Sequence, residues 1–240
     1  MERTPPPPLV IDVPASPRAE AAVHDVVPPT TEATPIQLTF KDVRYTITQL
    51  RPNPAALRCG GWPVRRSTRV ILDSVSGYVR AGEMVALMGG SGAGKSTLLD
   101  ILAGIPKRGR VSGTVLVNGK DVRRVRRSIG YVSQEDYLMG TQTVREAVAF
   151  YVRLRSPRGT ARDEQARVVD EILDILDLRK IEHALIGTAR RRGISGGEKK
   201  RVSIGCELAT DPGIVYLDEP TTGLDSFSSL NVVEALRRLA

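Results

Sequence analysis

The sequence contains few of the residue types that mark several large classes of protein. Aromatic residues make up only 4 % of its 240 residues, so a core must be built mainly from Val, Leu, Ile and Ala. Histidine and cysteine occur twice each, with no CxxC motif and no Cys/His cluster, as His24, His183, Cys59 and Cys206. This pattern makes a zinc finger or a similar metal site unexpected. We expect both cysteines to be free thiols in a reducing compartment.

Long apolar runs are also missing. No stretch approaches the roughly 18 consecutive apolar residues of a membrane-spanning helix. No apolar segment follows a basic N-terminus, as it would in a secretory signal. The sequence therefore predicts a chain that is soluble by itself, or one that reaches a membrane through a part it does not contain.

Positive charge is in excess, with 35 Lys and Arg against 27 Asp and Glu and a formal net charge of +8. The charge lies in short runs at 107–110, 123–127, 190–192 and 199–201. No aromatic-rich or zinc-binding motif accompanies these runs, so we expect no nucleic-acid partner. They favour a solvated surface that tolerates anionic neighbours, such as ATP or an anionic cytoplasmic leaflet.

Two regions differ sharply in composition. Residues 1–36 hold nine of the sixteen prolines, with a run at 5–8, and show no helical or strand period. We predict a disordered tail there, although the proline run could also be a ligand for an SH3-type domain. The rest of the chain, 37–240, alternates strand and helix patterns, which indicates an α/β domain with a mainly helical insert at about 141–210.

Several elements can be predicted individually. Apolar and polar residues alternate in the first predicted strand, and the apolar run at 83–88 is typical of a strand buried on both faces. A capping box begins at Thr143, and Asn118-Gly119 is a hairpin signal. Apolar residues from Val168 to Leu176 are spaced to make one stripe of a helix. We predict strands at 36–47, 83–88, 113–117, 128–132 and 213–217, helices at 144–155, about 168–176 and 226–240, and a loop at 50–66.

The strongest motif is GGSGAGKST, which satisfies G-x-x-x-x-G-K-[ST] between a predicted strand and a predicted helix. Glycines let successive backbone N–H groups face a phosphate, and the helix N-terminus adds its dipole. Lys95 brings a positive charge to the β- and γ-phosphates, and Ser96 offers a hydroxyl to Mg²⁺. A dinucleotide-binding G-x-G-x-x-G fails, because its third glycine would fall at Lys95. The predicted ATP-binding residues are Gly89, Gly90, Ser91, Gly92, Ala93, Gly94, Lys95, Ser96 and Thr97.

An acidic pair follows the predicted strand at 213–217. Ligands of open α/β sheets bind at the carboxyl ends of strands, so Asp218 is placed to hold Mg²⁺. Glu219 is placed to polarise a water for attack on the γ-phosphate. Gln134, after another strand, is either a plain surface amide or a group that reaches Mg²⁺ or the attacking water.

A second glycine-containing turn lies in ISGGEKKR. Ser195 and Glu198 satisfy a capping box, which predicts a helix N-terminus. Two glycines weaken such a first turn, so Gly196 and Gly197 indicate that something approaches closely, and an anion is the natural candidate. Because the first loop already surrounds one set of phosphates, we predict that this turn serves a nucleotide bound to another subunit.

The ordered motifs GGSGAGKST, YVSQED, ISGGEKKR, VYLDEP and TTGLDS resemble the nucleotide-binding domain of an ABC transporter. The run at 193–226 resembles more narrowly the G subfamily of half-transporters, which export lipids, sterols or xenobiotics. The similarity covers about residues 37–240. It implies a P-loop NTPase (RecA-like) core with an antiparallel β portion and a helical insert. It also implies hydrolysis of ATP with Mg²⁺.

The resemblance assigns a role to each motif. Residues 89–97 would be the Walker A loop, and Gln134 the Q-loop residue that links the site to a membrane domain. Ser195, Gly196 and Gly197 would be the signature motif, which contacts ATP held by the opposite subunit in a head-to-tail dimer. Asp218 would be the Walker B magnesium ligand, and Glu219 the catalytic base. Asp225 would be the aspartate of the D-loop.

Three departures from the family pattern matter. The family's switch histidine lies beyond the D-loop, and this chain ends at Ala240 before reaching it. We therefore expect the isolated chain to be weakly active. The transmembrane half is absent too, so the family's place at the cytoplasmic face of a membrane applies to a longer protein. No clear adenine-stacking aromatic is present, and Tyr45 is either that residue or an ordinary strand residue.

Two other functions remain open at this point. A soluble ABC ATPase acting on ribosomes or DNA would suit the positive charge, but such proteins usually carry two nucleotide domains or a long coiled-coil insert. A non-catalytic regulator that binds ATP and pairs with full-length subunits would suit the missing histidine.

Overall fold

The computed structural model describes residues 36–52, 64–188 and 190–240. The predicted tail, except for Ile36, lies outside the described residues, as do His24, Cys59 and positions 53–63 of the predicted loop.

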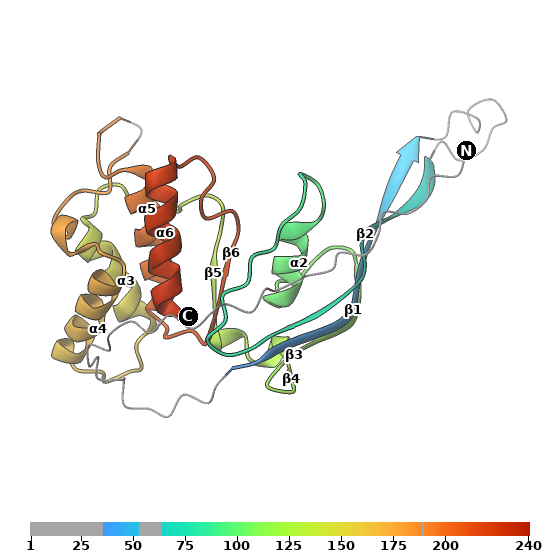
Figure 1. Cartoon of the computed structure of the whole chain (residues 1–240), viewed down its shortest axis with the longest axis horizontal. Coiled ribbons are helices and arrows are strands. Elements are labelled where there is room, and N and C mark those ends of the chain that lie inside the picture. Colours follow the sequence, from blue (N-terminus) through green and yellow to red (C-terminus); the bar gives the residue numbers. More distant parts are fainter. Residues whose placement is uncertain (1–35, 53–63, 189) are drawn as a thin grey trace, which may run out of the picture.

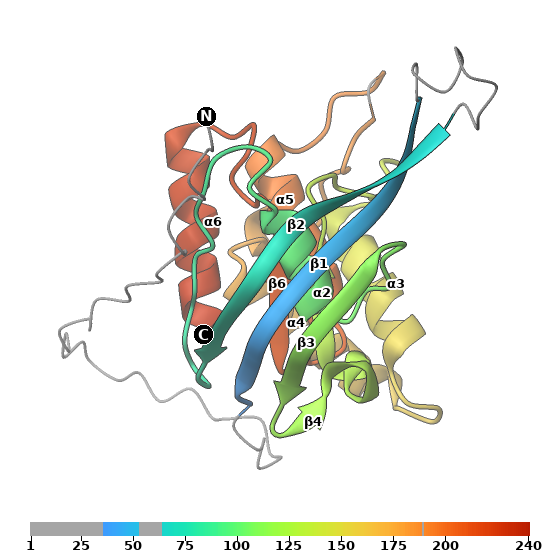
Figure 2. The ribbon, with the colours of Figure 1, turned by 90° about the vertical axis from the view of Figure 1, so that its right-hand side faces the viewer.

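A curved antiparallel sheet forms one side of the molecule (Figure 2), with its strands in the order β2-β1-β3-β4. Their bounds are β1 Leu38–Pro52, β2 Val64–Val79, β3 Arg110–Val117 and β4 Lys120–Asp121. The predicted hairpin between β3 and β4 is confirmed, since Asn118 and Gly119 both have a positive φ, of 48° and 74°. Positive φ at both central residues is what a two-residue type I′ turn requires.

The loop predicted at 50–66 is wrong at both of its ends. β1 continues to Pro52 and β2 already begins at Val64, and these two residues are partners in the ladder. The long antiparallel pairing of β1 with β2 outweighs the loop-like composition at its ends, because strand preference depends strongly on the pairing context.

Helix α2 (Lys95–Leu102) lies between this sheet and a second, parallel sheet (Figure 1), formed by β5 (Ile129–Val132) and β6 (Ile214–Leu217). These two strands match those predicted at 128–132 and 213–217. Leu98 of α2 packs in one core with Phe40 of β1 and Tyr216 of β6. The Tyr216 hydroxyl donates a hydrogen bond to the Leu102 carbonyl at 3.1 Å. These contacts hold α2, and the loop before it, against β6.

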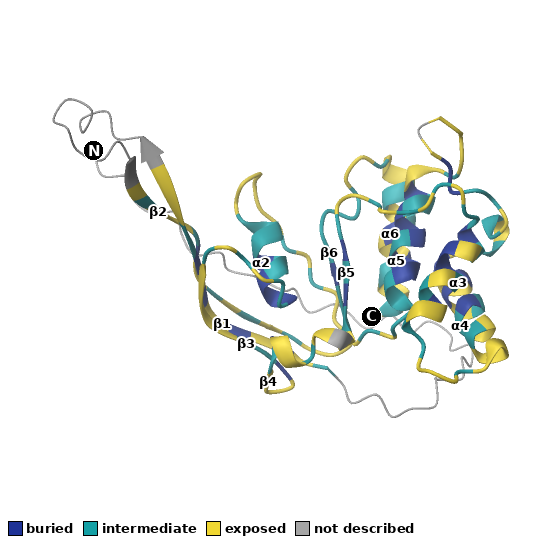
Figure 3. Cartoon of the chain, turned by 180° about the vertical axis from the view of Figure 1, so that it is seen from behind, coloured by how far each residue is buried: buried dark blue, intermediate teal, exposed yellow. Residues whose placement is uncertain are grey.

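The helices on the other side of β5 and β6 form a second core (Figure 3), which includes Val132 of β5. The predicted capping box of α3 is present at Thr143, and the predicted apolar stripe of α4 is buried at Val169, Ile172 and Leu173. The bounds are α3 Val144–Arg155, α4 Arg162–Ile175, α5 Gly196–Leu208 and α6 Ser226–Leu239. The predicted α/β fold with a helical insert is confirmed by this arrangement.

The strand predicted at 83–88 is wrong. This segment has no strand, and Met84 and Met88 are 51 % and 79 % exposed. Among the described residues, no hydrogen bond joins the backbone of 84–88 to β5 or β6. An apolar run becomes a buried strand only when a ladder partner satisfies its N–H and C=O groups. In the described part of the chain, β5 and β6 pair only with each other.

None of the helices in the described part of the chain is long and apolar enough to cross a bilayer.

Candidate functional site

The loop at 89–94 leads directly into helix α2. Gly94 is the N-cap of α2 with a φ of 93°, and Gly92 has a φ of 77°, so both need glycine's freedom of conformation. At Gly94 a Cβ would also lie 2.9 Å from Cδ2 of Leu72. No side chain caps the first turn of α2, and that turn holds no acidic residue. Its free N–H groups and its positive dipole end favour an anion.

Lys95 folds back over this loop. Its Nζ donates to the carbonyl oxygens of Gly89, at 2.9 Å, and Gly90, at 3.1 Å. Among the described residues it has no carboxylate partner. Its charge is therefore unneutralised and lies beside the uncapped helix end.

Ser96 and Asp218 meet although 122 positions separate them in the sequence. The Ser96 hydroxyl donates to Oδ1 of Asp218 at 2.9 Å, and both side chains are half-buried. The backbone N–H of Asp218 donates to the Val132 carbonyl, which ties the end of β6 to the end of β5. A hydroxyl and a carboxylate are hard oxygen donors, so this pair fits Mg²⁺.

Glu219 and Gln134 also meet. The Gln134 amide donates from Nε2 to Oε2 of Glu219 at 3.0 Å, and the Thr222 hydroxyl donates to the same oxygen at 3.1 Å. Glu219 has a φ of 51°, a left-handed backbone conformation that residues other than glycine rarely adopt. Sequence reasoning missed Thr222, whose only signal is its position in the turn three residues after Glu219.

The Ser195 turn begins α5, as predicted, with the reciprocal capping box of Ser195 and Glu198. Ser195 and Gly196 are exposed. Gly197 is buried, and a Cβ there would lie 2.8 Å from Cβ of Ser228 at the start of α6. The close approach predicted for the glycine pair thus occurs at Gly197 with a helix of the same chain, whereas Gly196 remains open.

The predicted residues therefore form two separate groups. The first contains Lys95, Ser96, Gln134, Asp218 and Glu219. The second contains the Ser195 turn and Asp225, which is the N-cap of α6 and accepts a hydrogen bond from the Ser228 N–H at 3.1 Å. No hydrogen bond or ion pair of the described residues joins the second group to the loop at 89–94.

Residues 72–222 match the sequence profile of the family described as "ABC transporter". The chain belongs to the ABC transporter family. The ABC transporter G family member 12 of Dictyostelium discoideum is 40 % identical over 85 % of this chain and 36 % of its own length. G family member 17 of Arabidopsis thaliana is 39 % identical, over 91 % of this chain and 33 % of its own length. The predicted resemblance to a nucleotide-binding domain of the G subfamily is confirmed.

A solved ABC structure shares the fold. The ATP-binding cassette MJ0796, in a dimeric post-hydrolysis state bound to ADP and Pi, aligns with a TM-score of 0.63 and 25 % identity. The alignment covers 84 % of this chain and 82 % of that one. The chain is thus an ATP-binding domain of the ABC ATPase type. It spans only about a third of the length of the two curated relatives named above.

Other residues singled out in the sequence lie outside this ABC site. Tyr45 is only 7 % exposed, within the core of the antiparallel sheet, and its hydroxyl accepts a hydrogen bond from the Gly109 N–H. This favours the strand interpretation over adenine stacking. Cys206 is a buried free thiol whose pKa is raised by burial to about 12, so it is unsuited to act as a nucleophile. His183 is exposed beside Glu182.

The basic run at 199–201 is not the solvated surface that its charge predicts. Lys200 and Arg201 are only 3 % and 9 % exposed. Both face inward on α5, where Gly197 and Ile204 lie one turn before and after them, because the helix buries that stripe against its neighbours. The run at 190–192 is exposed, as expected.

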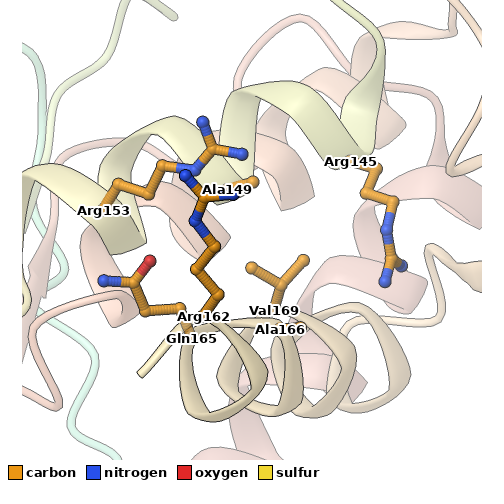
Figure 4. Close-up of a pocket in the computed structure, with 7 residues that line it drawn as sticks. All are labelled: Arg145, Ala149, Arg153, Arg162, Gln165, Ala166 and Val169. Atoms are coloured by element: carbon orange, nitrogen blue, oxygen red, sulfur yellow. The ribbon is translucent and has the colours of Figure 1, made fainter. Parts of the chain in front are cut away.

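A cavity of about 380 Å³ lies between α3 and α4 (Figure 4). None of the predicted site residues of the ABC domain lines it. It is lined by Arg145, Ala149, Arg153, Arg162, Gln165, Ala166 and Val169.

Proposed function

We propose that the chain binds Mg-ATP at residues 89–97 and hydrolyses it as one half of a head-to-tail pair. The hydrogen bond between Ser96 and Asp218 carries this proposal, since it brings the predicted Walker A and Walker B residues to one point. Chance matches to either motif would have no reason to meet there.

The N–H groups of the loop and the α2 N-terminus bind the phosphates, and Lys95 neutralises charge on the β- and γ-phosphates. This requires its Nζ to exchange the Gly89 and Gly90 carbonyls for phosphate oxygens. Mg²⁺, held by Ser96 and Asp218, would neutralise charge on the phosphate oxygens. Gln134 would add its amide oxygen Oε1 as a further ligand, since its hydrogen bond to Glu219 uses only Nε2.

Glu219 acts as the general base that takes a proton from the attacking water. Gln134 and Thr222 fix the direction of its carboxylate by donating to one oxygen. The other oxygen, Oε1, is then the one that faces the water. Preorganised orientation of this kind lowers the barrier because the base needs no rearrangement at the moment of reaction.

The Ser195 turn contributes to the ATP of a partner subunit, with Ser195 and Gly196 as the exposed donors. Support comes from the dimeric state of MJ0796 and from the described residues, among which no hydrogen bond joins this turn to its own loop at 89–94. Asp225 lies beside this turn through the contact of Ser228 with Gly197, so it would also lie at the subunit seam.

At the scale of the longer protein, residues 37–240 are the nucleotide-binding domain and residues 1–36 a tail. ATP hydrolysis by this domain, at the cytoplasmic face of the membrane, would drive export of a lipid, sterol or xenobiotic through transmembrane domains. Support comes from the G family membership of the relatives.

The substitution Lys95→Ala tests the site. Loss of the phosphate-facing charge should weaken binding of a fluorescent ATP analogue by at least about tenfold, measured by titration. Lys120→Ala, at an exposed lysine of β4, is the matched control and should bind as wild type does. Equal affinity in the two variants would show that the phosphates bind elsewhere.

A further inference from the structure

Lys200, on α5, is the most buried charged residue among the described residues, at 3 % exposure, and its side chain has several partners. Its Nζ lies 2.8 Å from Oδ1 of Asp136 and donates to the carbonyl oxygens of Gln134, at 2.9 Å, and Ser133, at 3.3 Å. Lysine is rarely buried unless it is paired. Here all of its partners belong to one loop, the exit loop of β5.

The same loop carries Gln134. The backbone carbonyl of Gln134 accepts from Lys200, while its side-chain amide donates to Glu219. Gln134 is thus held from both sides, by α5 through its main chain and by the proposed general base through its side chain. A shift of the loop relative to α5 would move the amide away from Glu219.

Helix α5 also begins with the Ser195 turn. Lys200 lies five positions after Ser195, which is about 7.5 Å along a helix axis at 1.5 Å per residue. The capping box fixes the start of α5, so Ser195 and Lys200 move as parts of one rigid element. Lys200 therefore connects the Gln134 loop to the helix that carries the Ser195 turn, although the two motifs are far apart in the sequence.

We infer that Lys200 is a positioning residue that fixes the Gln134 loop to α5. It thereby sets the orientation of Glu219 at one ATP site according to the position of the Ser195 turn, which serves the opposite site. This inference rests on the proposed function for its consequence in catalysis, but the anchoring of the loop stands on the contacts alone. Lys200 touches neither ATP nor the water and acts through Gln134.

The first measurement follows the loop itself. Lys200→Met keeps the length of the side chain and removes its charge and its donors. Amide hydrogen exchange, followed by mass spectrometry, should rise in peptides covering 133–139 by about tenfold or more in rate, because the loop loses its anchor. Lys199→Met, at the neighbouring lysine of α5, is the control and should leave this exchange unchanged.

The second measurement follows the chemistry. In single-turnover hydrolysis of radiolabelled ATP, Lys200→Met should lower the rate by about tenfold while the affinity for a fluorescent ATP analogue stays within about twofold. In a Gln134→Ala background the same substitution should cost less than about twofold further, since the residue through which Lys200 acts is gone. A merely structural lysine would give the same loss in both backgrounds.

The outcomes separate cleanly. Unchanged exchange at 133–139 overturns the anchor, and a full loss of rate in the Gln134→Ala background overturns the route through Gln134. If wild-type protein binds no ATP, the proposed function fails while the exchange result still decides the anchor. Should Lys200→Met not fold, Asp136→Asn removes the ion pair alone, and a smaller rise in exchange over the same peptides is expected. No rise in that variant counts against the anchor.

Discussion

Glu219 combines two backbone constraints that oppose each other. Its φ of 51° places it in the left-handed region, and it precedes Pro220, which disfavours helical conformations at the residue before it. Such a conformation costs on the order of 1–3 kcal/mol and persists only when its surroundings impose it. The turn after β6 does so through the Thr222 N–H, which donates to the Glu219 carbonyl, and through the Thr222 hydroxyl. In this turn the Glu219 carboxylate accepts a hydrogen bond from the Gln134 amide at 3.0 Å.

Glu219→Gln separates binding from chemistry at this residue. The amide keeps the size of the side chain and can still accept from Thr222 and Gln134 through its oxygen, but it cannot take a proton. We expect unchanged affinity for an ATP analogue and a fall in single-turnover hydrolysis by at least about 10²-fold. Glu234→Gln, at an exposed position of α6, is the control. Hydrolysis at the wild-type rate would remove Glu219 from the role of general base.

At the scale of elements, the N-termini of α5 and α6 lie against each other. Each begins with its own side-chain cap, Ser195 for α5 and Asp225 for α6. The hydrogen bonds that Asp225 accepts from Ser228 hold the pKa of its carboxyl below its usual value, so it stays ionised at the positive end of α6. Gly197 makes the contact possible, because a side chain there would meet Ser228. The two motifs that the sequence places 30 residues apart are thus one packed unit.

Gly197→Ala should separate these two helix ends. Alanine would favour the helix by about 1 kcal/mol over glycine, but its Cβ would lie 2.8 Å from Cβ of Ser228, and overpacking costs about 1–3 kcal/mol. We expect a net loss of up to about 2 kcal/mol in the free energy of unfolding, measured by urea denaturation.

Gly196→Ala is the matched control for that change. Its Cβ would lie 3.2 Å from Cδ2 of Leu224, the mobile end of a side chain, so we expect no loss of stability. Ser228→Gly should remove the clash that Gly197→Ala creates. The double variant should therefore be more stable than the sum of the two single changes predicts. Additive losses would mean that the contact does not explain the glycine.

The elements also show which features a sequence can predict. The capping boxes at Thr143 and Ser195, the hairpin at Asn118-Gly119 and the α4 stripe are local patterns, and each is found as predicted. The strand expected at 83–88 failed because a strand depends on a distant ladder partner, which no local pattern specifies. The burial of Lys200 was missed for the same reason, since its partners lie 64 or more residues away.

At the scale of the whole molecule, β5 and β6 lie between two cores, with α2 on one side and the other helices on the other (Figure 1). Residues placed at the ends of these strands can therefore contact both sides, as Asp218 contacts Ser96, and as Gln134 contacts Glu219 and Lys200. The Ser195 turn belongs to the helical side, and no hydrogen bond of the described residues joins it to the loop at 89–94. Under the proposed function, a single chain thus holds two half-sites that do not complete each other.

Complementation between damaged chains tests this arrangement. Lys95→Ala damages the half-site proposed to hold phosphate, and Ser195→Arg places a bulky side chain on the turn proposed to reach the partner's ATP. Pairs are enforced by fusing the two variants, through flexible Gly/Ser linkers, to the two strands of a heterodimeric coiled coil. The tether raises the effective concentration of the partner to the millimolar range, so weak pairing does not limit the assay.

Each tethered pair of identical variants has a lesion in both of its composite sites. The mixed pair has one site that carries both lesions and one that carries neither, provided that the sites form head to tail. We therefore expect ATP turnover in the mixed pair to approach half that of the tethered wild type, and turnover in both identical pairs to be at least about tenfold lower.

The untethered mixture shows how much of the signal requires pairing. If the Ser195→Arg pair turned over ATP as the wild-type pair does, the turn would not serve the opposite site. If the mixed pair stayed as inactive as its parents while binding ATP at its one undamaged loop, either the head-to-tail geometry would be wrong or both sites would have to be intact. A pair with only one Ser195→Arg lesion separates these two explanations, because its undamaged site remains active only in the first.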